Sequence, residues 1–214
     1  MRLLLFIAVL LALSPAFSQE NERFNLVLSG GGVGSQVDGD FYGGYDKFGP
    51  YGGIYLNRAI GEKVSIDFGL TYIQKGARHN ASQQDPTGFY ISRLNYVEMP
   101  LLFSGYYKKK YRFEGGLTVA YLFKSHEESA KVGVINTGWK SYDVGYAAGF
   151  GYKLSDKVYT NLRYNYSLVP IRAYQANVYL GTFWTRLFNK GLYNNLIQLS
   201  INYIISPKEK NSEQ

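Results

Sequence analysis

The sequence predicts an all-β protein: an eight-stranded antiparallel transmembrane β-barrel that follows a cleaved signal peptide. Three observations lead to this prediction. Segments of nine to twelve residues alternate between apolar and polar side chains, which is the two-residue period of a β-strand. The polar positions of these segments carry few charges. The connections between them alternate between short and long, as they do in barrels of the bacterial outer membrane.

The alternation is clearest in residues 64–74, where Val64, Phe68 and Tyr72 belong to an unbroken apolar series and the residues between are small or polar. Five further segments repeat this pattern: 94–105, 112–123, 142–152, 160–168 and 196–204. Together the six segments hold 64 residues, of which only six are charged, and all six stand on the polar side. They are Asp67, Glu98, Arg112, Glu114, Asp143 and Arg163.

This low charge separates a membrane barrel from a soluble β-protein. Six charges on about 32 polar positions amount to about 19%, whereas soluble surfaces carry about 25–35% charged residues. We therefore expect the apolar face to lie in lipid and the six charges to lie in the barrel lumen as a structural network. Buried charges need partners. Because four acids and two bases do not balance, we expect Lys75 or Arg93 to join them.

The first residues read as a targeting segment rather than as part of the fold. Arg2 precedes an apolar stretch at 3–13, and Ala16-Phe17-Ser18 is a small-x-small cleavage signal, so residues 1–18 form the expected signal peptide, cut between Ser18 and Gln19. The barrel is expected over 19–205 and a polar tail over 206–214. The chain has no cysteine, which excludes disulfides, thiolate metal sites and lipid attachment through cysteine. A mean hydropathy of −0.20 excludes a helical membrane protein.

The connection lengths give the number of strands. Residues 58–63, 106–111 and 153–157 are short turns, and 35–47, 76–89, 124–140 and 172–191 are longer loops. These seven connections imply eight strands, which we place at 24–34, 48–57, 64–75, 90–105, 112–123, 141–152, 158–171 and 192–205. The turns are expected in the periplasm and the loops outside. Aromatic girdles are expected from Tyr72, Phe123 and Tyr142 at one interface and from Tyr106, Tyr152 and Tyr203 at the other. Pro100 is expected at a bulge, because a closed barrel has no free edge.

Four stretches carry a family resemblance. They are Tyr72-Ile73-Gln74-Lys75-Gly76, Leu94-Asn95-Tyr96-Val97-Glu98-Met99-Pro100-Leu101-Leu102, Leu162-Arg163-Tyr164-Asn165-Tyr166-Ser167-Leu168 and Gly149-Phe150-Gly151-Tyr152. On these residues the chain resembles the PorT-like outer-membrane β-barrel family of the Bacteroidota, from about Asn25 to Ile205. The resemblance implies a barrel in the outer membrane and brings no catalytic residues. PorT itself is associated with type IX secretion and gliding. The polar tail departs from barrels that end at an aromatic residue.

The sequence carries no pattern typical of catalysis or cofactor binding. Both histidines, His79 and His126, fall in expected outer loops. His126-Glu127-Glu128 lacks the second histidine of the H-E-x-x-H metal motif, because residue 130 is alanine. Ser125 and Ser129 have no spacing that would orient a base on a nucleophile. We expect no enzyme activity, no cofactor, no metal and no nucleic-acid partner.

An eight-stranded barrel has an interior just wide enough to be filled by side chains. We therefore expect an integral outer-membrane protein without an open pore, with a surface or envelope-assembly role. Its expected partners are outer-membrane lipid and proteins of the envelope or of a secretion machine. Two alternatives stay open: a PorT-type component of type IX secretion or gliding, and an exported lipocalin-like carrier with an apolar lumen and a charged exterior.

Overall fold

The computed structural model describes residues 24–40, 43–81, 88–130, 133–134, 138–173 and 191–206, and no helix in these ranges could span a membrane. Eight long strands are present: β1 (Phe24–Asp38), β2 (Lys47–Ala59), β3 (Val64–Lys75), β5 (Tyr90–Tyr107), β6 (Tyr111–Ser129), β8 (Tyr142–Lys153), β9 (Val158–Ser167) and β11 (Gly191–Ile205). Three two-residue strands accompany them: β4 (Arg78–His79), β7 (Gly133–Val134) and β10 (Arg172–Ala173). The expected signal peptide with its Ser18–Gln19 site, and residues 207–214 of the tail, lie outside the described residues.

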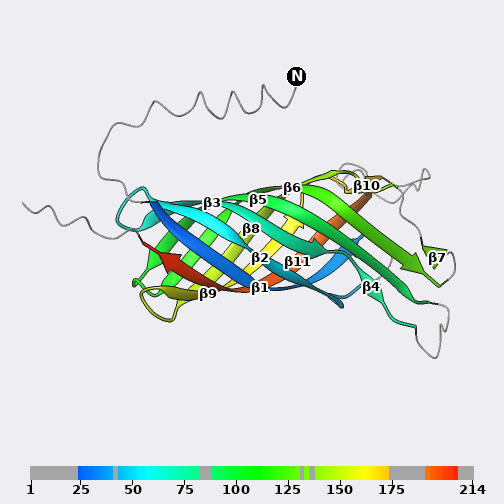
Figure 1. Ribbon diagram of the computed structural model, residues 1–214, viewed down its shortest axis with the longest axis horizontal. Coiled ribbons are helices and arrows are strands. Elements are labelled where there is room, and N and C mark those ends of the chain that lie inside the picture. Colours follow the sequence, from blue (N-terminus) through cyan, green and yellow to red (C-terminus); the bar gives the residue numbers. More distant parts are fainter. Residues whose placement is uncertain are drawn as a thin grey trace, which may run out of the picture.

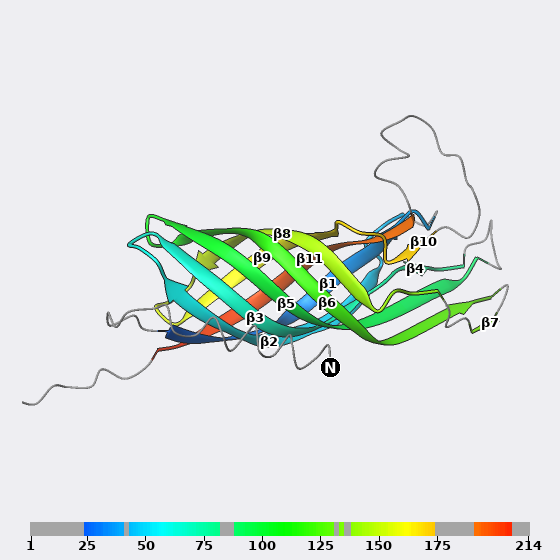
Figure 2. The same cartoon turned by 90° about the horizontal axis from the view of Figure 1, so that it is seen from above.

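The eight long strands form a closed ring. Each pairs antiparallel with the next in the order β1, β2, β3, β5, β6, β8, β9, β11. β11 returns to pair with β1 over a ladder that runs from Leu26–Ile205 to Asp38–Tyr193. Figures 1 and 2 show the tilted strands winding around one axis in two perpendicular views. The predicted all-β fold with eight barrel strands is confirmed.

The strand limits agree with the sequence prediction where the alternation is regular. β3 has the predicted limits, and β2, β5, β8 and β11 match within two residues at each end. β1 runs four residues farther than predicted, β6 runs six residues farther, and β9 stops four residues earlier. Both extended strands reach into segments that the sequence had assigned to loops.

The two ends of the barrel differ. Short turns at one end join β2 to β3, β5 to β6 and β8 to β9, so this end faces the periplasm. At the opposite end β5 and β6 project beyond the other strands, with β4 beside β5 and β7 beside β6 (Figures 1 and 2). We call residues 90–95 of β5 and 124–129 of β6, together with β4 and β7, the extracellular extension.

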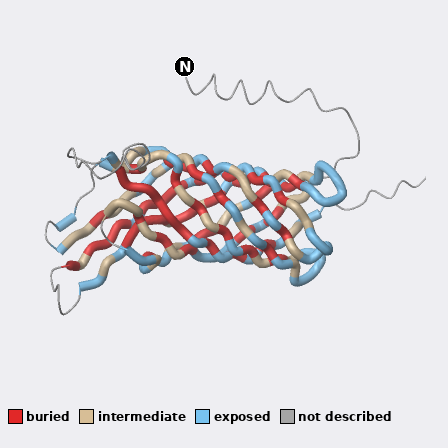
Figure 3. Tube along the Cα trace, turned by 180° about the vertical axis from the view of Figure 1, so that it is seen from behind, coloured by how far each residue is buried: buried red, intermediate tan, exposed pale blue. Residues whose placement is uncertain are grey.

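Side chains alternate between lumen and exterior along every long strand. In Figure 3 buried and exposed positions follow one another along the tilted strands of the ring. Outward side chains are large and apolar, such as Leu117 at 55% exposure and Leu199 at 61%. Inward positions on the same strands are buried, such as Thr118 and Ser200. An exposed apolar band around a polar interior is the arrangement of a barrel in lipid.

A β-bulge at the base of the extracellular extension changes which residues face inward. Tyr96 of β5 pairs with Leu122 of β6, but Asn95 pairs with Lys124, so Phe123 is an extra residue on β6. Before this point the buried residues of β6 are even-numbered: Arg112, Glu114, Thr118 and Ala120. After it the buried residue is odd-numbered, Glu127. One extra residue therefore exchanges the two faces of the strand.

The bulge expected at Pro100 is absent, because the pairs on either side of it, Phe68–Leu101 and Thr71–Glu98, keep one register. Gly69 of β3 lies opposite Pro100. A Cβ at Gly69 would stand 2.5 Å from the Tyr55 ring and 2.9 Å from the Pro100 ring. The missing side chain thus makes room for two rings that fill the lumen where the proline cannot donate a hydrogen bond.

Glycines interrupt the apolar series on the outer face of β1. Gly30, Gly32 and Gly34 replace outward apolar side chains and leave a groove of about 610 Å³ between Phe48 and Leu199 on the membrane-facing side. The glycine at position 31 is needed for a different reason. A Cβ there would stand 2.0 Å from the backbone oxygen of Leu199 on β11, so glycine permits the two strands to pair closely.

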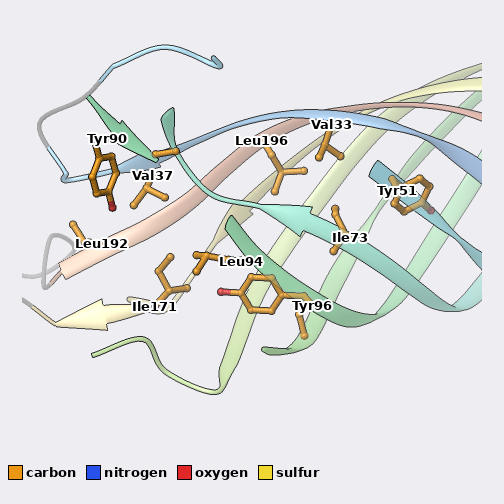
Figure 4. Packing of buried hydrophobic residues seen from close by; sticks show 12 residues of the cluster. Val33, Val37, Tyr51, Ile73, Tyr90, Leu94, Tyr96, Ile171, Leu192 and Leu196 are labelled. Atoms are coloured by element: carbon orange, nitrogen blue, oxygen red, sulfur yellow. The ribbon is translucent and has the colours of Figure 1, made fainter. Parts of the chain in front are cut away.

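The extracellular half of the lumen is filled by an apolar cluster. Figure 4 shows Leu94 and Tyr96 of β5 meeting Ile171, while Val33 and Leu196 lie nearby on β1 and β11. A smaller cluster around Val27, Tyr55 and Leu102 lies nearer the periplasmic end. The lumen charges lie among these packed side chains.

Candidate functional site

The periplasmic half of the lumen holds four of the six sequence-predicted charges in one cluster. The Arg112 guanidinium lies 2.6 Å from the Asp67 carboxylate and 3.4 Å from that of Glu114. Arg163 donates from Nε to the other oxygen of Glu114. Because the two arginines share Glu114, the four groups form one connected structure, which we call the lumen quartet.

Neutral side chains complete the quartet. Ser104 donates to Asp67 at 2.7 Å, and Asn161 donates to Glu114 at 2.7 Å. Arg163 donates from Nη1 to the Tyr55 hydroxyl at 2.8 Å. These donors and acceptors come from different strands around the ring, so the quartet ties opposite walls of the barrel together. Charge-assisted hydrogen bonds of this kind are stronger than neutral ones.

The other two sequence-predicted charges, Glu98 and Asp143, both form ion pairs with Lys75. Lys75 Nζ lies 2.7 Å from Glu98 and 3.2 Å from Asp143, and its ammonium stands 5.0 Å from the centre of the Tyr96 ring. All three charged side chains are at most 3% exposed. Of the two candidates for the extra base, Lys75 takes this place, whereas Arg93 is exposed on the outer face of the extracellular extension.

The lumen therefore contains seven charged residues from predicted positions, four acidic and three basic, each in an ion pair with another. The space beside Lys75 and Asp143 holds no void large enough for water. The charged side chains beside Lys75 and Asp143 therefore pack closely against one another and against their neighbours.

The extracellular end contains a further, partly buried ion pair, which the sequence did not reveal. Arg172 of β10 donates to Glu127 of β6 at 3.0 Å through Nη1 and again through Nη2. Tyr90 donates to Glu127 at 2.9 Å and the Trp139 indole donates at 3.1 Å. The Arg172 guanidinium also stands 3.6 Å above the Trp139 ring centre, within cation–π range. We call these four residues the extracellular clamp.

The clamp joins segments that are far apart in sequence: β5, β6, the segment before β8, and β10. Glu127 became available because the bulge turned it inward. The inward orientation of Glu127 could have been predicted only by extending the strand past residue 123 and shifting the alternation of inward and outward residues by one position. Arg172 and Trp139 carried no signal, because they belong to segments without periodicity.

The histidines lie on strands rather than in the loops where they were expected. His79 is in β4 and His126 is in the extension of β6, on its outer side. The His126 ring nitrogen Nε2 lies 3.6 Å from the exposed carboxylate of Glu128. Within the described ranges no three histidine, aspartate or glutamate side chains form a group that could hold a metal ion.

The aromatic girdles are present with one correction. Tyr72 and Phe123 face outward with ring centres 6.1 Å apart, and Tyr152 and Tyr203 are exposed near the periplasmic end. Tyr106 was assigned to the periplasmic girdle, but its hydroxyl accepts from Arg112 at 3.4 Å, so it faces the lumen mouth.

The family model for the outer membrane protein beta-barrel domain matches residues 17–172. The chain belongs to this family. The barrel is therefore an integral protein of the outer membrane, as its exposed apolar band requires. The lipocalin-like alternative is wrong, because such a carrier would have a charged exterior, whereas the exterior of this outer-membrane barrel is apolar between its two ends.

Solved structures show the same fold at low sequence identity. The attachment invasion locus protein Ail of Yersinia pestis has a TM-score of 0.51 and 11% identity, covering 86% of this chain and 99% of that chain. Ail in complex with the heparin analogue sucrose octasulfate gives a TM-score of 0.50 and 12% identity, with the same coverage. Neisserial surface protein A gives 0.47 and 10%, covering 84% of this chain and 96% of that one. A search of curated protein sequences found no match.

Proposed function

We propose that this outer-membrane barrel is a non-enzymatic surface or envelope-assembly protein that acts through its extracellular end and has no open pore. The observation that carries the proposal is the contrast between a filled lumen and an ordered extracellular extension. The lumen quartet and the ion pairs of Lys75 with Glu98 and Asp143 fill the interior together with the apolar side chains packed around them. A barrel filled in this way supports recognition at its rim better than diffusion through its centre.

The chemistry of the extension supports binding outside the membrane. Outward residues below the bulge are apolar, such as Val97 and Tyr121. Above it they become Arg93, Lys124 and Glu128, which suit water and polar partners. The extracellular clamp holds β5 and β6 against β10, so this polar surface is presented in a fixed shape. A pre-ordered surface loses less conformational entropy when a partner binds.

Two measurements test this proposal. In planar bilayers the purified barrel should produce no stepwise ion conductance, and stable open channels would contradict the filled lumen. In living cells a photocrosslinking amino acid at His126, on the outer side of the extension, should form discrete adducts with surface molecules. The matched control is the same group at Lys157 in a periplasmic turn. Equal adducts at both positions, or adducts only at Lys157, would contradict an extracellular site of action.

A second candidate is a PorT-type component of type IX secretion or gliding. One observation favours it: the most specific part of the family resemblance, Asn95 to Pro100, includes the bulge at the base of the extracellular extension. Deleting the gene and measuring secreted proteins in the medium separates the candidates. Cargo that accumulates in the periplasm would support the PorT-type role. We expect unchanged secretion, because likeness in fold does not carry function with it.

A further inference from the structure

The periplasmic mouth of the lumen contains a pocket that neither the proposed function nor the family match explains. Its volume is about 270 Å³. The three short turns and the end of β11 surround it, so residues from four separate parts of the chain meet there. Arg112 lies at its inner side, and the side chains of Lys109, Lys110 and Lys153 line it. We call it the periplasmic pocket.

Positive charge exceeds negative charge around this pocket. Four basic residues line it, and two carboxylates, Glu62 and Asp156, do so as well. The Lys153 ammonium donates to Asp156 at 2.8 Å, and this hydrogen bond lowers the pKa of the Asp156 carboxyl, so that pair is neutral overall. Lys109 and Lys110 form no ion pair with any residue that the structure describes. Their charges are available to a ligand.

The inner side of the pocket supplies further donors. Arg112 is 5% exposed, and its Nη1 donates to the hydroxyls of Tyr106 and Tyr159 at 3.4 and 3.2 Å. Its Nε is buried and has no hydrogen-bond partner among the described residues. The ring of Tyr159 stands 4.9 Å from the guanidinium carbon. The charge of Arg112 is paired with Asp67 and Glu114 in the lumen quartet, so its part here is to fix the two tyrosines, whose hydroxyl groups can donate to a ligand.

The turn that carries the lysines has a backbone conformation that lysine rarely adopts. Lys108 and Lys109 have φ angles of 50° and 54°. The backbone N–H of Lys110 donates to the backbone carbonyl of Tyr107 at 3.3 Å, which closes the turn. Such a hairpin turn ordinarily contains Asn-Gly, because both central residues have positive φ. Sparsely populated backbone conformations cluster at functional sites. Here the strained turn brings two consecutive lysines to the edge of the pocket.

We propose that the periplasmic pocket binds an anionic phosphate group. A phosphate accepts several charge-assisted hydrogen bonds at once, so it can use the lysine ammonium groups that surround one cavity. The group can belong to a soluble periplasmic molecule or to a phospholipid headgroup. The pocket lies at the mouth of the lumen, inside the ring of turns, which favours the soluble source.

Calorimetric titration of the folded full-length barrel with inorganic pyrophosphate in non-ionic detergent tests the proposal. The Lys109→Ser/Lys110→Ser variant removes the unpaired charges of the pocket. The matched control, Lys63→Ser/Lys157→Ser, removes two lysines from the other turns that do not line it. We expect saturable binding to the wild type, at least about tenfold weaker binding to the pocket variant, and a change of less than about twofold in the control.

Unboiled gel migration should show first that both variants are folded. Absence of saturable binding to the wild type, or equal weakening in both variants, would overturn the proposal, since the latter indicates general charge attraction. Repeating the titration in nanodiscs identifies the source. If phosphatidylglycerol nanodiscs abolish the binding seen in phosphatidylcholine nanodiscs, the phosphate is that of a lipid headgroup. Equal binding in both indicates a soluble phosphate ligand.

Discussion

The lumen quartet and the extracellular clamp are both arginine–carboxylate clusters, but they are built differently. The quartet uses side chains of long, regularly alternating strands, such as Arg163 on β9 and Glu114 on β6. The clamp uses one residue turned inward by a bulge, Glu127, and one on a two-residue strand, Arg172. One cluster is part of the barrel wall, whereas the other fastens segments that lie outside the ring.

The same chemical pair can therefore stabilise the whole molecule or only one end of it. Every strand of the ring depends on its neighbours for backbone hydrogen bonds, so a fault at the quartet affects the entire barrel. The extension can open while the ring stays closed, because regions of a protein unfold locally with different free energies. Four predictions follow the comparison, from the largest effect to the smallest.

Arg163→Leu should lower the free energy of unfolding by about 3–5 kcal/mol, because it leaves the Glu114 carboxylate buried without its closest partner. Urea unfolding of the barrel in lipid vesicles measures this. Lys109→Leu, in an exposed turn, is the control and should change stability little. Equal, negligible effects of both substitutions would mean that Arg163 is solvated and that the assigned facing of β9 is incorrect.

Arg172→Leu should weaken the extracellular end by about 2 kcal/mol, the range of hydrogen bonds to charged groups, while the unfolding of the ring stays unchanged. Hydrogen exchange of the amides near Tyr90 and Glu127 should become faster, and that of β8 and β9 should not. A fall in global stability as large as that of Arg163→Leu would remove the distinction between the two clusters.

Deleting Phe123 tests the cause of the difference rather than its energy. Without the extra residue β6 pairs with β5 in continuous alternation, with Leu122 inward, Lys124 outward and Glu127 still inward, so the clamp should be kept. Limited proteolysis should then leave the extension as resistant as in the wild type, unlike in Arg172→Leu, while the unboiled protein migrates as a folded barrel. Cleavage in the same region as in Arg172→Leu would show that the bulge itself, and not only the number of residues, is needed to orient Glu127.

Lys108→Asn/Lys109→Gly should raise stability by about 0.5–1 kcal/mol, because Asn-Gly adopts the two positive φ angles of this turn with less strain. The effect should appear in urea unfolding as a higher midpoint with an unchanged slope. Lys63→Asn/Glu62→Gly, in a turn without positive φ among its described residues, is the control and should not stabilise. An equal gain in both would mean that the positive φ angles are not the source of the gain.

The parts predicted from sequence are those that the membrane dictates residue by residue. Lipid on one side and a packed lumen on the other require strict alternation of apolar and polar side chains. The alternation therefore predicted directly that Asp67 and Arg163 point into the lumen. Charge balance alone pointed to Lys75 as one of two candidates. Glu127 was missed because a single inserted residue reverses the pattern, and Arg172 because a short strand has no period. Pro100 was assigned to a bulge, but Gly69 on the neighbouring strand accommodates it instead.

The pairing of β1 with β11 has a consequence for how the chain reaches its folded state. Leu26 lies beside Ile205, so the ring closes only when strands from opposite ends of the described chain meet. Contacts of such large sequence separation make folding slow. Until they form, the edges of β1 and β11 can pair with other chains and aggregate. The ladder between the first and last strands therefore includes a glycine-rich strand, and the approach of β11 depends on the missing side chain of Gly31.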